Sequence, residues 1–156
     1  MDKVNIAYDI DGVLSIMCKR DKPYSKQNKF ERENFEKGRV RMYGNSPLLM
    51  RPKESFYIIS GRKEKYRMIS DEWLKKNNLK VIKSFYLTGK KTFDDISKFK
   101  ISKLKELNID RYYEDDPKLI REIKKALPNL EIIHIPRNEK NVKLLKTNGL
   151  QQQKIF

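Results

Sequence analysis

A short apolar run that ends in two aspartates, Ile6 to Leu14, constrains this chain more than any other segment. The residues before Asp9 are typical of a buried parallel strand, so Asp9 and Asp11 fall at its carboxyl end, where open α/β sheets bind ligands. Two carboxylates this close repel each other and stay ionised only beside a cation, and Mg²⁺ prefers such oxygen ligands. Gly12 permits a sharp turn there. The alternative is a strand followed by a turn with solvated carboxylates.

The composition is that of one charged domain. The chain has 156 residues and a net charge of +15, which favours a polyanionic partner, nucleic acid first, although a solvated Lys-rich surface fits as well. No stretch resembles a membrane span or signal peptide, so we expect no membrane partner. A single cysteine, Cys18, fits a reducing cytoplasm. We expect one domain over residues 1–150, a loose tail over 151–156, and a cytoplasmic location.

Apolar runs and amphipathic segments alternate along the chain, which predicts an α/β fold with a mainly parallel sheet flanked by helices. The predicted strands are Val4–Ile10, Phe56–Ile59, Val81–Leu87, Ile109–Tyr113 and Leu130–Ile135. The predicted helices are Leu48–Arg51, Lys63–Asn77, Lys100–Leu107, Lys118–Ala126 and Lys140–Leu145. Ser46 and Pro47 are typical of one helix start, and Asp116 and Pro117 of another. Trp73 is expected in the core.

Residues 16–43 form a basic segment with weak periodicity, which predicts a flap. Aromatic residues alternate there with cations, as on surfaces that bind single-stranded nucleic acid. The alternative is that the aromatic rings pin the flap to the core. The candidate nucleic-acid contacts are Lys19, Arg20, Lys26, Arg39 and Arg41, with Arg67 on the following helix.

A short basic motif, Gly89-Lys90-Lys91-Thr92, is similar to the end of a P-loop. The upstream glycine of that motif is missing, so the sequence argues against a triphosphate cradle. A basic turn is the better interpretation.

Polar side chains follow three of the predicted strands. Because the carboxyl ends of parallel strands meet at one edge of a sheet, we expect these groups to converge. Together with one lysine they suit phosphoryl transfer, in which one carboxylate attacks phosphorus and a second transfers protons. Mg²⁺, a hydroxyl and an ammonium would hold the phosphoryl oxygens. The groups are Asp9 and Asp11, then Ser60, then Glu114, Asp115 and Asp116.

Four segments, in this order, resemble the haloacid dehalogenase phosphohydrolase superfamily. The resemblance covers most of the chain and implies a Rossmann-like, mainly parallel sheet with a small flap in place of a large cap. The segments are Asp9-Ile10-Asp11-Gly12-Val13, Ile58-Ile59-Ser60-Gly61-Arg62, a lysine that opens the helix before the last acidic strand, and Tyr113-Glu114-Asp115-Asp116.

The resemblance also implies roles for these residues. Asp9 would be the nucleophile, and Asp11 the general acid and base. Both would also hold Mg²⁺, Asp11 through its backbone carbonyl, together with a ligand from the acidic segment. The phosphoryl group would be bound by Ser60, Gly61, Arg62 and Lys100.

Two of these assignments leave alternatives open. Lys98 and Lys103 compete with Lys100 for the lysine position. The acidic metal-binding pair is either Glu114 with Asp115 or Asp115 with Asp116, so Asp115 belongs to both.

A narrower resemblance concerns Ser60-Gly61-Arg62, Tyr66-Arg67-Met68 and Glu72-Trp73-Leu74. These segments are similar to the 3′-phosphatase domain of phage-type polynucleotide kinase–phosphatases. The sequence therefore predicts a Mg²⁺-dependent phosphomonoesterase that removes a 3′-phosphate from nucleic acid ends through an aspartyl-phosphate. The alternatives are a phosphatase of free nucleotides or other small phosphoesters, and a catalytically idle nucleic-acid-binding module.

Overall fold

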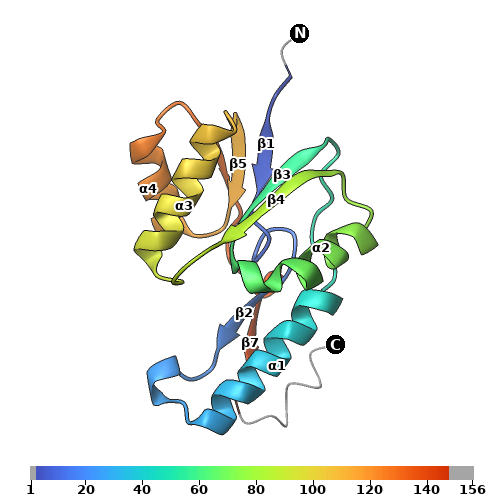
Figure 1. The fold of residues 1–156 in the computed structure, drawn as a ribbon, viewed down its shortest axis with the longest axis vertical. Coiled ribbons are helices and arrows are strands. Elements are labelled where there is room, and N and C mark those ends of the chain that lie inside the picture. Colours follow the sequence, from blue (N-terminus) through green and yellow to red (C-terminus); the bar gives the residue numbers. More distant parts are fainter. Residues whose placement is uncertain (1–2, 148–156) are drawn as a thin grey trace.

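The computed structural model describes residues 3–147, and the predicted tail over 151–156 lies outside them. Five parallel strands form the central sheet in the order β4-β3-β1-β5-β6 (Figure 1), which confirms the α/β fold with a mainly parallel sheet. The chain fills one side of β1 and then the other, so the carboxyl end of β1 is the place where such sheets bind ligands. The strands are β1 (Ile6–Tyr8), β3 (Phe56–Lys63), β4 (Val81–Leu87), β5 (Arg111–Glu114) and β6 (Glu131–His134).

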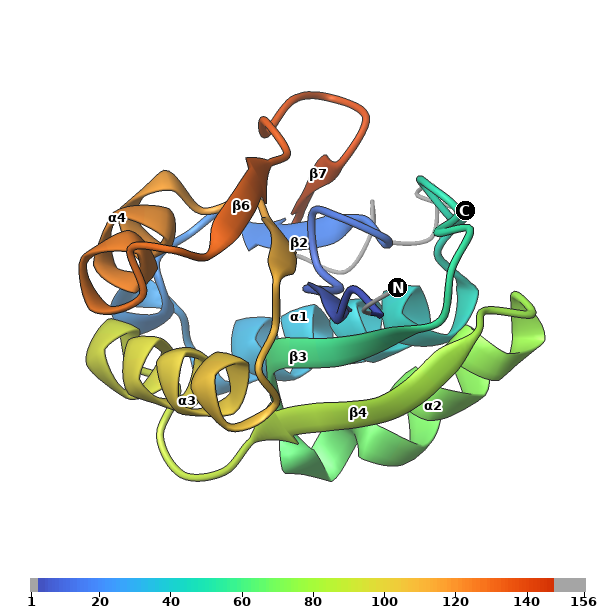
Figure 2. The same cartoon turned by 90° about the horizontal axis from the view of Figure 1, so that it is seen from above.

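Helices cover both faces of this sheet. The helices α3 (Phe93–Glu106) and α4 (Pro117–Ala126) lie together on one side of it. The short 3₁₀ helix η2 (Glu64–Tyr66) leads into α2 (Arg67–Lys76), which lies on the other side. The view along the sheet shows this arrangement (Figure 2).

Side chains on β1 alternate between the two faces, as a period of two requires. Tyr8 packs in a core that includes Trp73 of α2, whereas Ala7 packs in a second core that includes Leu104 and Ile123. The Trp73 ring is buried, and its Nε1 donates a hydrogen bond of 2.7 Å to the backbone oxygen of Ser46. Both faces of the strand that carries the aspartates are therefore packed.

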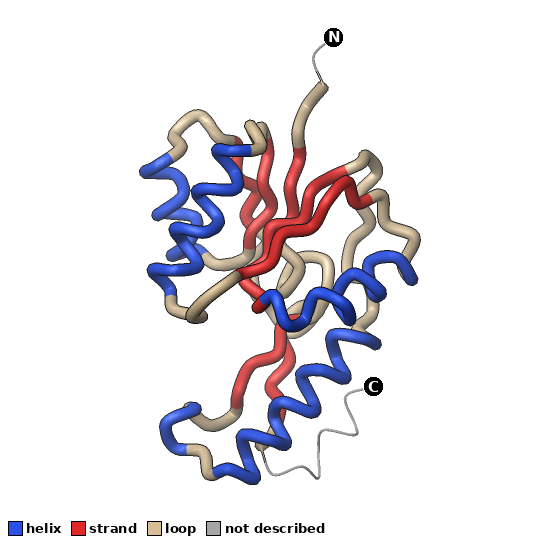
Figure 3. Tube along the Cα trace, viewed as in Figure 1, coloured by secondary structure: helices blue, strands red, loops and turns tan. Residues whose placement is uncertain are grey.

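A small lobe continues from the carboxyl edge of the sheet (Figure 3). It has its own core, which includes Phe35, Met42 and Leu145. Its two strands pair in parallel, so residues near the end of the described chain form a small sheet with residues that follow β1. The lobe consists of β2 (Met17–Arg20), the 3₁₀ helix η1 (Tyr24–Lys26), α1 (Lys29–Asn45) and β7 (Val142–Leu145).

The long helix α1 was not expected in the segment 16–43. Asn28 and Glu31 form a capping box that satisfies the backbone at its start. Charged side chains cover much of the helix and hide its apolar period, although Phe35 and Tyr43 are buried. Two of the four aromatic residues in this segment thus pack inside the protein, while Phe30 and Tyr24 are exposed.

Two predicted helices are wrong. Residues 48–51 form no helix, because Ser46 ends α1 with its N–H bonded to Met42 O and its hydroxyl accepting from Ile16 N. Residues 142–145 form strand β7 and not a helix, because they pair with β2. In both segments, contacts with residues far away in the sequence determine the secondary structure, and the local sequence pattern carries no information about these contacts.

The other differences are shifts of element boundaries. Helix α3 begins at Phe93 behind the cap residue Thr92, so Lys100 lies within the helix and does not open it. Strand β3 continues to Lys63 with a change of register after Ser60. The predictions for Val81–Leu87 and for the α4 start at Asp116 are confirmed. None of the helices within residues 3–147 is long and apolar enough to cross a membrane.

Replacing Trp73 with Ala removes a buried ring and its hydrogen bond to Ser46, so we expect the free energy of unfolding to fall by about 3–5 kcal/mol. Urea denaturation monitored by far-ultraviolet circular dichroism measures this change, because that signal does not depend on the fluorescence of Trp73. The neighbouring exposed residue provides the control, since Glu72→Ala should change stability by no more than about 0.5 kcal/mol. Equal effects of the two substitutions would contradict the packing described here.

Candidate active site

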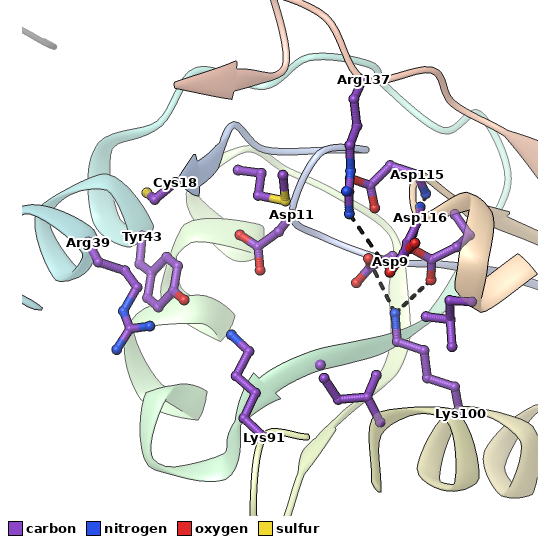
Figure 4. Close-up of a pocket in the computed structure, with 15 residues that line it drawn as sticks. Asp9, Asp11, Cys18, Arg39, Tyr43, Lys91, Lys100, Asp115, Asp116 and Arg137 are labelled. Carbon is purple, nitrogen blue, oxygen red and sulfur yellow. Dashed lines mark hydrogen bonds and ion pairs between the residues drawn. The ribbon is translucent and has the colours of Figure 1, made fainter. Parts of the chain in front are cut away.

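A pocket of about 200 Å³ lies where the sheet meets the lobe (Figure 4). The loop after β1 contributes Asp9 and Asp11, the end of β5 contributes its acidic segment, and α3 contributes Lys100. The lobe closes the other side of the pocket. Cys18, Arg39 and Tyr43 of the lobe line this side of the pocket.

The loop after β1 is held by its own backbone. The N–H groups of Val13, Leu14 and Ser15 all donate to the oxygen of Ile10. Gly12 has a φ of +79°, and a Cβ atom there would lie 2.2 Å from Oδ2 of Asp115. Glycine is thus required both by the backbone conformation and by the close approach of Asp115.

Lys100 is buried between two carboxylates. Its Nζ lies 3.3 Å from Oδ2 of Asp9 and 2.7 Å from Oε1 of Glu114. Burial alone would lower the pKa of Lys100, but these two carboxylates raise it above its ordinary value, so the ammonium stays charged. The same geometry fixes the direction in which Asp9 faces the pocket.

Glu114 has no free acceptor. Its Oε1 also accepts from Tyr112, and its Oε2 accepts from the backbone N–H groups of Asp115 and Asp116 at 3.0 and 3.1 Å. Burial opposes ionisation of Glu114, but Lys100 and these donors lower its pKa to about 2. Glu114 therefore holds Lys100 and the start of the following loop in place.

Asp115 points into the pocket, whereas Asp116 caps the next helix. Oδ2 of Asp115 accepts 2.9 Å from Nε of Arg137, and Oδ1 of Asp116 accepts from the N–H of Lys118. Burial, together with Glu114, raises the pKa of Asp115 to about 7 despite the Arg137 guanidinium. Within the acidic segment, Asp115 is the carboxylate placed to face a ligand.

The three carboxylates of Asp9, Glu114 and Asp115 form a buried cluster that fits a metal ion. Oxygen atoms from all three lie within 4.8 Å of one another. Burial raises the pKa of Asp9 well above its ordinary value, with Lys100 opposing and the other carboxylates adding to the rise. A divalent cation would offset this repulsion, and an all-oxygen donor set suits Mg²⁺. Because hydrogen bonds already occupy the oxygens of Glu114, Asp9 and Asp115 are the candidate ligands of such a cation.

Asp11 stands apart from this cluster because Arg62 holds it. Nε and Nη2 of Arg62 each donate 2.9 Å to one oxygen of Asp11, while Nη1 donates to Ser70. The guanidinium also lies 3.7 Å from the centre of the Tyr43 ring. Burial would raise the pKa of Asp11, but the Arg62 charge lowers it below its ordinary value. The structure thus places Arg62 on Asp11, and Arg62 does not line the open pocket.

The strand β3 turns toward the site through a bulge after Ser60. The Ser60 hydroxyl is fully buried and accepts from the N–H of Arg62 at 3.0 Å. Gly61 lines the pocket, whereas the buried Ser60 is not among the residues that line it. The hydroxyl proton of Ser60 remains available for donation.

The lysines that compete with Lys100 lie on the helix surface. Lys98 pairs with Asp94, and Lys103 pairs with Glu106. Only Lys100 of the three lines the pocket.

The six candidate nucleic-acid contacts do not converge. Arg39 lines the pocket, while Lys19 and Arg20 line a wider adjoining groove of about 780 Å³. Arg67 pairs instead with Glu64 and Asp71 on its own side of the sheet. The other two, Lys26 and Arg41, are exposed and line neither the pocket nor the groove.

Two cations of the pocket were missed from the sequence. Arg137 follows β6 and Lys91 follows β4, so the rule that places Asp9 at the sheet edge also places them there. Cys18 lines the pocket too, but burial raises the pKa of its thiol to about 12, so it stays protonated and is a poor nucleophile.

No protein-family model matches the chain, and no curated protein matches it. A chain in the structure of the Pnkp1/Rnl/Hen1 RNA repair complex is similar in fold, with a TM-score of 0.58 and 12% sequence identity. The match covers 87% of this chain and 43% of that chain, so this protein spans less than half of its length. At this identity the likeness shows a shared fold.

Replacing Gly12 with Ala drives a Cβ atom into Asp115, so we expect the affinity of the acidic cluster for a divalent cation to fall by about 10- to 100-fold. Isothermal titration with Mg²⁺ or Mn²⁺ measures this loss.

Gly89 is the matched control because its φ is +87° and nothing lies within 4 Å of an added Cβ. Gly89→Ala should cost about 1–2 kcal/mol of stability through the backbone alone and leave metal affinity unchanged. Unchanged metal affinity in Gly12→Ala would remove Asp115 from the proposed ligand set.

Proposed function

We propose that this protein is a Mg²⁺-dependent phosphomonoesterase of the haloacid dehalogenase type, acting on the 3′-phosphate of nucleic acid ends through an aspartyl-phosphate. The observation that carries the proposal is the arrangement of Asp9, which lies at the carboxyl end of β1 between the Lys100 ammonium and the Asp115 carboxylate. A carboxylate in this position faces the pocket in which a phosphate would sit.

In this proposal Asp9 attacks phosphorus, and the ester oxygen leaves. Lys100, which lines the pocket, offsets the negative charge of the phosphoryl oxygens. When bound by Asp9 and Asp115, Mg²⁺ would supply further positive charge between the nucleophile and the phosphate. Water then hydrolyses the acyl-phosphate and restores Asp9.

Asp11 is the proton-transfer group in this scheme. Arg62 aims its carboxylate into the pocket with two hydrogen bonds and keeps it ionised in the free protein. A phosphate ester bound beside it adds negative charge, which favours the protonated form that can donate to the leaving oxygen. Once that proton is gone, Asp11 can accept one from the attacking water.

Three features support nucleic acid ends as the substrate. The pocket of about 200 Å³ is small for a whole nucleotide, so most of the substrate would remain outside it. The net charge of +15 favours a polyanion. The similar fold found in an RNA repair complex is consistent with this substrate class.

The first test compares phosphate release by wild type and Asp9→Asn, with Mg²⁺ and with chelator. Wild type should release phosphate from a 3′-phosphorylated oligonucleotide only with Mg²⁺, and Asp9→Asn should reduce the rate by about a thousand-fold or more. The exposed Asp94→Asn is the control and should retain wild-type activity.

If the protein hydrolyses nucleoside monophosphates or an aryl phosphate but not the oligonucleotide, then the proposed reaction mechanism stands and the proposed substrate is wrong. A wild-type protein that hydrolyses no phosphomonoester would overturn the proposal and favour a binding module.

Lys100→Met keeps the apolar part of the side chain and removes the buried charge, so we expect kcat to fall by about 100-fold or more. Lys98→Ala and Lys103→Ala change surface pairs and should leave kcat within about two-fold of wild type. Steady-state kinetics on one phosphomonoester, with circular dichroism as a folding check, measures the three variants. A larger loss in either surface variant would contradict the assignment.

A further inference from the structure

The pocket has two chemically different halves (Figure 4). One half holds Asp9, Asp115 and Lys100, where the proposed attack takes place. Asp11 turns away from them toward the lobe, where Arg39, Tyr43 and Lys91 line the wall. If Asp11 gives its proton to the leaving oxygen, then that oxygen faces this second half, and the rest of the leaving group extends past it out of the pocket.

Lys91 also lines the pocket, but unlike the other cations there it is not paired with a carboxylate. Arg137 pairs with Asp115, Lys100 with Asp9 and Glu114, and Arg62 with Asp11. Within residues 3–147, Lys91 makes no hydrogen bond or ion pair, and its ammonium extends toward the space between Asp11 and Tyr43. Lys91 is exposed by its surface area, although the protein groups that surround its ammonium, with Arg39 adding and Asp11 opposing, lower its pKa.

Arg39 lies on the same side of the pocket and has donors to spare. Its Nη2 is held by Glu36 and by the Tyr66 hydroxyl, which fixes the guanidinium. Its Nε is buried and has no hydrogen-bond partner among the described residues. A fixed guanidinium that lines the pocket, on the same side as an unpaired ammonium, is an arrangement that suits an anion.

We propose that Lys91 and Arg39 form a second phosphate site, which binds the phosphodiester adjoining the terminal phosphate. This inference rests on the proposed function and narrows its substrate class to esters that carry a further phosphate on the leaving group. An oligonucleotide end has that phosphate, whereas a nucleoside 3′-monophosphate lacks it. The site would thus select polymer ends through the leaving group.

The adjoining groove along β2 is the competing path for the nucleic acid. Of its cations, Arg137 is held by Asp115, and Arg20 is stacked on Phe35 and bonded to Gln27. Glu139 also lines this groove and would repel phosphate. Lys19 is its remaining cation. Arg39 is likewise held by Glu36, so the two sites differ mainly in Glu139, which lines the groove together with Lys19.

The test uses wild type, Lys91→Ala and the adjacent Lys90→Ala, which does not line the pocket. The substrates are a dinucleotide with a 3′-phosphate, the same dinucleotide with a neutral methylphosphonate linkage, and a nucleoside 3′-monophosphate. Lys91→Ala should raise KM for the charged dinucleotide by roughly 10-fold, while any change in kcat that acts through Asp11 should be the same for all three substrates. Lys91→Ala should leave KM for the two other substrates unchanged, and Lys90→Ala should leave KM for all three substrates unchanged.

Equal losses on all three substrates would overturn the inference, because Lys91 would then act on the reacting phosphate. An unchanged KM for the charged dinucleotide would also overturn it, and a loss in Lys19→Ala in its place would assign the nucleic acid to the groove along β2. In each of these cases hydrolysis continues and the proposed function stands. A wild-type protein that hydrolyses none of the three, nor an aryl phosphate, would overturn both.

Discussion

The site depends on one buried ammonium, that of Lys100. Asp9 and Glu114 are buried at the ends of neighbouring strands, and two carboxylates in such a place would be costly without a cation. Lys100 satisfies both, and backbone N–H groups of the loop after β5 complete Glu114. This network joins β1, β5 and α3, so the packing of the sheet and the orientation of the proposed nucleophile are set together.

A second ion pair, between the half-buried Asp11 and the buried Arg62, holds the loop after β1 on the side that faces the lobe. It joins the loop after β1 to β3 and α2, and Tyr43 of α1 covers its guanidinium. Asp9 and Asp11 are two residues apart, yet each has its own cation and its own face of the pocket. This separation gives the two carboxylates different electrostatic environments, as a nucleophile and a proton-transfer group require.

The sheet and the convergence of acidic residues could be predicted because both follow from local patterns and from the geometry of parallel strands. The role of Arg62 could not, because nothing in its neighbourhood in the sequence indicates a partner 51 residues away. The flap was predicted over residues 16–43, but the part that β7 contributes to the lobe was missed for a similar reason, since β7 becomes a strand only through its pairing with β2. Lys91 and Arg137 could have been predicted, because each follows a predicted strand at the same edge of the sheet.

The central claim is that Asp9 forms a covalent bond to phosphorus. The most direct measurement is rapid acid quenching of the protein during turnover of a phosphomonoester with Mg²⁺, followed by peptide mass spectrometry. The account predicts a phosphoryl group on Asp9 that hydroxylamine removes, and its absence in Asp9→Asn. A phosphoryl group on another residue, or steady turnover with none on the protein, would contradict it.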